Sequence, residues 1–172
     1  FYGVGKVSAE KLKQAGILTG EDLFPLSKEE LEKKFGTLGP RLYLQVRGES
    51  NDQLTLHRER KSIGTERTLI KDTTDHGILT GYLEEFAQEL ERMLRKRSLA
   101  ARTVTLKLRD SEFNTITKSV TMRDYLNKQE EIYSIAVQLF EEMMEERPIR
   151  LIGLTVSHLE NTNRLYKQLK LF

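Results

Sequence analysis

Two neighbouring segments of the chain alternate hydroxyl or cationic side chains with apolar ones. In residues 102–109 the apolar positions are Val104, Leu106 and Leu108, and the polar positions are Thr103, Thr105, Lys107 and Arg109. In residues 115–123 the apolar parity holds Ile116, Val120 and Met122, and the polar parity holds Thr117, Ser119 and Thr121. Because strand side chains alternate between two faces, these segments predict a hairpin with one buried and one polar face. Hydroxyls and cations without a carboxylate suit a phosphate backbone, which accepts hydrogen bonds and attracts positive charge.

A second candidate for phosphate contact is the turn Gly3-Val4-Gly5, which precedes a helix predicted over about residues 7–15. Glycines let a backbone come close to a phosphate, and amides at a helix N-terminus donate hydrogen bonds to it. Lys6 adds a positive charge. The turn and the Ala-Glu-Lys-Leu and Gly-Ile that follow resemble the second half of a helix-hairpin-helix motif. The alternative is a plain turn without a ligand.

The sequence offers no spacing typical of a catalytic or metal site. Its three histidines are isolated, it has no cysteine, and no phosphate-binding loop or Ser-His-Asp set is visible. The densest acidic stretch, residues 141–146, places carboxylates four residues apart, as on a solvated helix face. We therefore expect binding without catalysis, and no cofactor or metal held by these residues.

The polar segments belong to a regular succession of predicted elements. Residues 1–56 have a helical pattern with capping-box spacings at Thr19/Asp22 and Ser27/Glu30. From Lys61 onward the pattern is strand, helix, strand, strand, helix, strand. The predicted fold class is α+β: a small all-helical, helix-hairpin-helix-like unit, followed by a βαββαβ four-stranded sheet with two helices on one face.

The expected domain boundaries follow the change of pattern along the chain. A helical unit occupies residues 1–56, a linker 57–61, the sheet domain 62–159, and a flexible tail 160–172. The predicted strands carry a net positive charge and the predicted helices a net negative one, so the open side of the sheet should be basic. No apolar run approaches the length of a membrane helix, and the lack of cysteine fits a reducing cytoplasm.

Segments along essentially the whole chain resemble the Y-family of translesion DNA polymerases. ARTVTLKLRDSEFNTITKS, with RKSIGTERT before it and IRLIGLTVSHL after it, is similar to that family's little-finger domain. FYGVGKVSAEKLKQAGI is similar to the family's thumb, and the final QLKLF is similar to the peptide by which bacterial members bind the sliding clamp. The resemblance implies a C-terminal fragment of an error-prone polymerase, without the catalytic palm.

The resemblance also implies which residues contact DNA, through thumb amides and the open face of the little-finger sheet. Carried over by position, they are Gly3, Gly5, Lys6, Lys61, Ser62, Gly64, Thr65, Arg67, Arg102, Thr103, Thr105, Lys107, Arg109, Lys118 and Ser119. Arg102 and Lys118 lie at positions that alternation assigns to the apolar side of their strands. They would therefore reach DNA only at a strand end or beside a bulge.

The implied partners are primer–template DNA of any sequence and the sliding clamp. The expected clamp contacts are Gln168, Leu169, Leu171 and Phe172. Nucleotidyl transfer needs carboxylates that hold two Mg²⁺ ions, and in the family these lie in the palm, which would precede Phe1. We therefore expect a monomer that is inactive alone, from a DNA-repair polymerase of the bacterial cytoplasm and nucleoid.

Two other functions share the predicted order of elements. Single-stranded RNA-binding modules are also βαββαβ, but they stack bases on aromatic side chains of the central strands. Here Phe113 and Tyr125 only flank the polar face. A domain that binds an acidic protein through its basic sheet is the third possibility, and composition does not exclude it.

Overall fold

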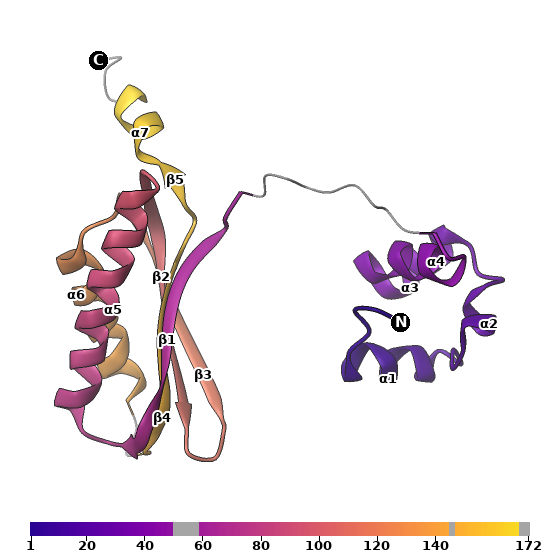
Figure 1. Cartoon of the computed structure of the whole chain (residues 1–172), viewed down its shortest axis with the longest axis horizontal. Helices are drawn as coiled ribbons and strands as arrows, with labels where there is room; N and C mark the ends of the chain where they lie inside the picture. Colours follow the sequence, from indigo (N-terminus) through magenta and orange to yellow (C-terminus); the bar gives the residue numbers. More distant parts are fainter. Residues whose placement is uncertain (50–58, 145–146, 169–172) are drawn as a thin grey trace. The chain divides into compact units, whose positions relative to one another are not determined.

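The computed structural model describes residues 1–49, 59–144 and 147–168, which form two compact units, Phe1–His57 and Arg58–Phe172 (Figure 1). The division between them falls inside the linker expected at residues 57–61. Within the described ranges, no helix is long and apolar enough to span a membrane.

The first unit is a set of short helices, two of which begin with side-chain caps. They are α1 (Lys6–Gln14), α2 (Gly20–Leu23), α3 (Lys28–Phe35), the 3-10 turn η1 (Gly36–Leu38) and α4 (Gly39–Val46). Both expected capping boxes form: the Thr19 amide donates to Asp22 at 2.8 Å, and the Ser27 amide donates to Glu30 at 2.8 Å. Backbone amides, first that of Leu18, lower the pKa of Asp22. Polar side chains thus begin α2 and α3 where the sequence predicts.

Five buried side chains form the core of this unit: Leu12, Ile17, Leu23, Leu31 and Leu42. The close approach of α3 to α4 depends on Gly39, because a Cβ at that position would lie 2.3 Å from the backbone of Leu31. A side chain there would separate the two helices.

The second unit is an antiparallel sheet with α5 and α6 on one face (Figure 1). Its elements are β1 (Ser62–Thr73), α5 (His76–Lys96), β2 (Leu99–Asp110), β3 (Thr115–Leu126), α6 (Gln129–Met143) and β4 (Ile149–Ser157). The long strands lie in the order β1-β4-β2-β3. This arrangement confirms the predicted α+β fold class and the predicted succession of elements.

The segment after β4 differs from the flexible tail expected from residue 160. Glu160–Asn161 forms β5, which pairs with Leu99 and Ala100 of β2, and Thr162–Gln168 forms α7. The Thr162 amide also donates to the Ser98 carbonyl oxygen at 2.9 Å. Backbone hydrogen bonds to β2 therefore extend the ordered domain beyond the expected boundary at 159.

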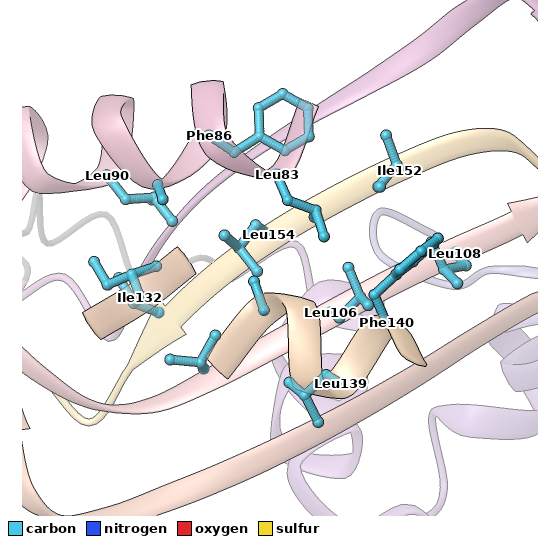
Figure 2. Packing of buried hydrophobic residues seen from close by; sticks show 14 of the residues in the cluster. Leu83, Phe86, Leu90, Leu106, Leu108, Ile132, Leu139, Phe140, Ile152 and Leu154 are labelled. Atoms are coloured by element: carbon cyan, nitrogen blue, oxygen red, sulfur yellow. The ribbon is translucent and has the colours of Figure 1, made fainter. Parts of the chain in front are cut away.

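The core of the second unit lies between the helices and the sheet. Figure 2 shows Leu83, Phe86 and Leu90 of α5 with Ile132 and Phe140 of α6 facing strand residues such as Leu106 and Leu154. The three predicted core residues of β2, Val104, Leu106 and Leu108, are at most 1% exposed. Period-two alternation therefore identified the buried face of this strand correctly.

The apolar parity of β3 is only partly buried. Ile116 is 46% exposed and Met122 is 38% exposed, although both were expected on the buried face. These side chains stay exposed because β3 is an edge strand of the sheet. Of its residues, Leu126 and, in part, Val120 pack into the core. Alternation assigns a side of the sheet, but burial depends on what covers it.

Candidate nucleic-acid interface

The sheet side opposite α5 and α6 is a polar surface, which we call the open face. Strand register aligns its positions in four rows: Ser62–Ser157–Thr103–Thr121, Gly64–Thr155–Thr105–Ser119, Glu66–Gly153–Lys107–Thr117 and Thr68–Leu151–Arg109–Thr115. The intervening residues Ile63, Val104 and Val156 are buried against the helices. Because side chains alternate, the four rows point away from the helices.

Cross-strand hydrogen bonds order the hydroxyls between β2 and β3. Thr103 and Thr121 share a hydrogen bond of 2.9 Å, and Thr105 and Ser119 share one of 2.8 Å. Arg109 Nε donates to Thr115 Oγ1 at 2.7 Å. Thr103 is 6% exposed and its hydroxyl also bonds to His158 Nδ1 at 2.7 Å, so this pair is part of the sheet's own network. The Thr105–Ser119 pair is more exposed, and its two hydroxyls have more lone pairs than their one mutual bond uses, so it keeps hydrogen-bonding capacity toward a ligand.

Three charged residues lie in the four rows: Glu66, Lys107 and Arg109. Lys107 Nζ lies 2.7 Å from Glu66 Oε2, and their side chains are 31% and 54% exposed. The sequence predicted the two cations on this surface. It did not predict the carboxylate, which comes from a strand that lies two strands away from Lys107 in the sheet.

Thr65 and Arg67, expected on the open face, lie on the helix side of the sheet. Thr65 Oγ1 donates to Glu89 of α5 at 3.0 Å, and Arg67 lies 3.8 Å from Glu85 of the same helix. Both share the parity of the buried Ile63, which decides their side. The alternation in β1 therefore indicates the correct side for both residues, whereas carrying over contacts from the resemblance position by position assigned them to the wrong side.

Lys118 also lies on the helix side, where its Nζ contacts Glu142 of α6 at 2.7 Å. This hydrogen bond is the largest cause of a lowered pKa at Glu142. Strand alternation therefore assigned Lys118 correctly to the helix side of the sheet, and Lys118 is not part of the open face.

Arg102 has a different environment, next to a register shift between Ala101 and Thr103. Ala101 is fully buried, so the alternation reverses across this irregularity and Arg102 does not enter the core. Its Nε donates to the Met122 carbonyl oxygen at 3.2 Å, and its guanidinium lies 5.5 Å from the centroid of the Tyr125 ring. The bulge that the expectation required is present.

Lys61, Ser62 and Gly64 lie at the beginning of β1, and all three are exposed. Lys61 directly precedes the strand, whereas Ser62 and Gly64 belong to the open face. A Cβ at Gly64 would lie 2.4 Å from Thr155 Oγ1. Gly64 therefore makes room for a hydroxyl of β4.

Several open-face residues were missed by the sequence interpretation. They are Glu66 and Thr68 of β1, Thr115 of β3, and Gly153, Thr155 and Ser157 of β4. The alternation of Gly153, Thr155 and Ser157 with the buried Ile152, Leu154 and Val156 was the available signal. β4 contributes to the middle of the surface because it lies between β1 and β2.

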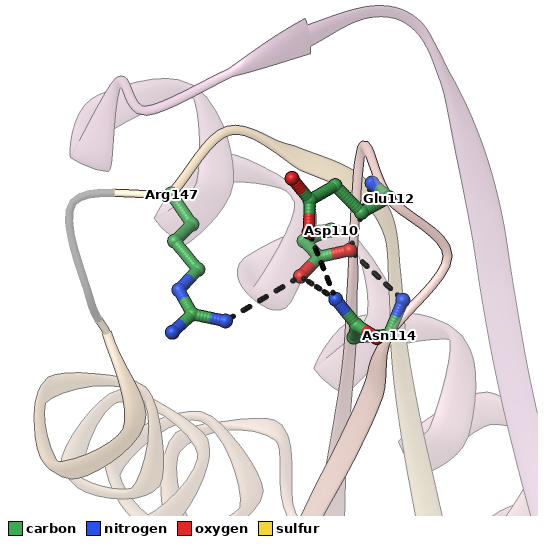
Figure 3. A network of polar contacts seen from close by, with 4 residues as sticks. All are labelled: Asp110, Glu112, Asn114 and Arg147. Atoms are coloured by element: carbon green, nitrogen blue, oxygen red, sulfur yellow. Dashed lines mark hydrogen bonds and ion pairs between the residues drawn. The ribbon is translucent and has the colours of Figure 1, made fainter.

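The turn between β2 and β3 is held by Asp110, as Figure 3 shows. Its carboxylate accepts hydrogen bonds from the amides of Glu112 and Asn114, each at 2.9 Å, and from Asn114 Nδ2 at 3.0 Å. Arg147 lies 3.8 Å away. The Asn114 side chain is the main cause of a lowered pKa at Asp110, since these bonds favour the charged carboxylate. The network fixes the end of the hairpin that carries Arg109.

In the helical unit, the expected contacts Gly3, Gly5 and Lys6 lie at the beginning of α1. Gly3 has φ +82°, and a Cβ there would lie 2.9 Å from Arg41 Nη2. Gly5 is the N-cap of α1, and a Cβ on it would meet nothing within 4 Å. Lys6 is exposed beside it. Gly5, Lys6 and Val7 are exposed, so the beginning of α1 is accessible to a backbone.

The remaining expected sites fall at the end of the chain. Gln168 is the last residue of α7, and Leu169, Leu171 and Phe172 lie outside the described residues. Within the described ranges, no group of three or more His, Asp or Glu residues is placed to hold a metal ion.

Comparison with known proteins relates both units to DNA polymerases. Residues 60–171 match the model of the impB/mucB/samB family C-terminal domain, and residues 2–50 match that of the DNA polymerase-iota thumb domain. DNA polymerase IV of Listeria monocytogenes serotype 4a is 45% identical over 161 residues, which cover 93% of this chain and 45% of that protein. DNA polymerase IV of Leptospira interrogans is 40% identical over 171 residues, which cover 95% and 47%.

A solved structure shares the fold. A Y-family DNA polymerase chimera superposes with a TM-score of 0.68 and 21% identity, covering 94% of this chain and 46% of that one. The chain thus spans about half the length of the relatives it matches. Taken together, the two matched domains and their order show that the chain belongs to the Y-family DNA polymerases, as a C-terminal part made of thumb and little-finger domains.

Proposed function

We propose that the chain is the duplex-gripping part of a translesion DNA polymerase, with the open face against the phosphate backbone. The observation that carries this proposal is the composition of the four rows, in which ten positions are Ser or Thr and two are cations. Phosphate backbones are contacted by such groups in a sequence-independent way. A polymerase that accepts any template needs contacts of that kind.

The same surface disfavours recognition of single-stranded RNA. Modules that bind RNA with a βαββαβ sheet stack bases on aromatic rings. None of the four rows contains Phe, Tyr or Trp. The surface offers hydrogen bonds and charge, which fit the outside of a duplex.

The test is duplex binding over a series of salt concentrations by fluorescence anisotropy. Lys107→Ala/Arg109→Ala should bind at least about tenfold more weakly, with a salt slope lower by about two, because two phosphate contacts are lost. The matched control is Arg67→Ala/Lys118→Ala, which removes two cations from the helix side of the sheet. The control should bind like the unmodified chain, and equal losses in both double variants would rule out the open face as the binding surface.

We further propose that residues 168–172 tether the polymerase to a sliding clamp. In support, Gln168 and the apolar Leu169, Leu171 and Phe172 combine a polar group with apolar anchors of the kind that dominate short-peptide binding. Deletion of residues 168–172 should abolish binding to a purified bacterial clamp and leave duplex affinity unchanged. Unaltered clamp affinity after the deletion would contradict the assignment.

The activity of the whole polymerase is part of the same proposal. Template-directed nucleotidyl transfer would be performed by the part of the relatives' length that this chain does not cover, since it spans 45% of the Listeria protein and 47% of the Leptospira protein. The chain's own role is then to hold the primer–template, and its tether raises the local concentration of a weak DNA grip.

A further inference from the structure

We infer that Glu66 sets the duplex affinity of the open face by competing with phosphate for Lys107. This inference rests on the proposed function, since it concerns the strength of that same surface. Glu66 is the single carboxylate within the four rows, and its Oε2 lies 2.7 Å from Lys107 Nζ. A carboxylate at that distance accepts one of the ammonium's three hydrogen bonds and offsets its charge, so it competes with a phosphate oxygen for the same cation.

The ion pair depends on a glycine between its partners. Glu66 and Lys107 both align with Gly153 of β4, so the pair spans two strand spacings, about 10 Å. Any side chain on Gly153 would stand between them, since even a Cβ there would lie 2.8 Å from the Cβ of Glu66. The absence of a side chain on the central strand therefore lets the carboxylate reach the lysine across the surface.

The charges on the two sides of the sheet are neutralised from different sources. On the helix side, Arg67 is paired by Glu85 of α5 and Lys118 by Glu142 of α6. On the open face, which lies opposite α5 and α6, the carboxylate comes from a strand, because Glu66 of β1 accepts a hydrogen bond from Lys107. Arg109, the other cation of the proposed phosphate-binding surface, instead donates from its Nε to the Thr115 hydroxyl.

The competition is reversible because the pair is exposed. An ion pair whose partners are 31% and 54% exposed is weak and screened by salt, so a phosphate can take over the lysine. Glu66 is then left close to the phosphate and repels it. Removing the charge of Glu66 should therefore tighten duplex binding, on the order of three- to tenfold at low salt.

The experiment measures duplex binding by the full chain at several salt concentrations. Glu66→Gln should bind more tightly, and its salt slope should be steeper by up to about one. In the unmodified chain, the Glu66 carboxylate that phosphate displaces from Lys107 takes up a cation from solution, whereas the glutamine of the variant has no charge and takes up none. Glu85→Gln is the matched control, since it makes the same charge change beside Arg67 on the helix side. It should bind like the unmodified chain.

A double variant shows whether Glu66 acts through Lys107. In Lys107→Ala, the further change Glu66→Gln should tighten binding less than it does in the unmodified chain. Unchanged or weaker binding by Glu66→Gln overturns the inference, as does an equal gain from Glu85→Gln. These outcomes differ from a failure of the proposed function, in which Lys107→Ala itself would bind as tightly as the unmodified chain.

Discussion

At the scale of single residues, side chains with the same charge have different surroundings according to strand parity. Lys107 lies on the open face, whereas Lys118, the partner of Leu106 in the ladder, lies on the helix side against Glu142. Arg109 and Arg67 differ in the same way. A count of cations in the strands therefore overstates the charge that a ligand on the open face would meet.

Asp110 should make the stability of the sheet domain depend on pH. Its pKa is lowered in the folded state, so it contributes stability above about pH 4 that is lost as the pH falls through the folded-state pKa. Asp110→Asn should lower the urea midpoint at pH 7, and the difference from the unmodified chain should shrink toward pH 3. Asp124→Asn, which makes the same charge change at an exposed position of the same hairpin, is the control. A difference that stays constant with pH would contradict this role.

At the scale of elements, α5 and α6 cover one side of the sheet and also carry the carboxylates that pair with its cations. Glu85 and Glu89 of α5 contact β1, and Glu142 of α6 contacts β3. The helices thus neutralise the side that they bury. The opposite side carries the ten Ser and Thr residues of the four rows and two cations, of which Lys107 is paired with Glu66.

Two glycine-to-alanine changes test how closely the helices pack. Gly39→Ala should destabilise the helical unit by about 1–3 kcal/mol, because its Cβ would overlap the Leu31 backbone. Gly81→Ala on α5 meets nothing within 4 Å and should stabilise the sheet domain by about 0.5–1 kcal/mol. Urea unfolding measures both, and a tolerated Gly39→Ala would mean that α3 and α4 can separate without cost.

At the scale of the whole molecule, each unit has its own buried cluster, which predicts two separate unfolding transitions. Residues 58–172 made alone should keep the denaturant midpoint of the second transition in the full chain. The helical unit, at 57 residues, should unfold first because so short a chain buries little of its surface. A single transition in the full chain, or a shifted midpoint in the fragment, would show that the two units are coupled.

The two units should also bind duplex together better than either does alone. Each holds a candidate backbone contact, at Gly5 in the first and on the open face in the second. If both engage one duplex, residues 58–172 alone should bind at least about tenfold more weakly than the full chain. Titration of the two proteins with the same labelled duplex measures the difference, and equal affinities would restrict the interface to the sheet.

The sequence by itself determined the elements and the polar character of the hairpin. Capping boxes at Thr19 and Ser27, and the alternation around Leu106, depend on residues a few positions apart, so local spacing was sufficient. The same alternation, applied from Ile63, would have placed Thr65 and Arg67 on the helix side.

Only the tertiary structure decided which residues meet across the sheet. Placing β4 between β1 and β2 brings Glu66 to Lys107 over Gly153, although 41 residues separate the pair along the chain. Strand parity specifies two sides, but not the order of the strands or the side that the helices cover. Long-range packing therefore decided which charged residues share the open face, whereas the alternating hydroxyl residues of β2 and β3 could be recognised in the sequence.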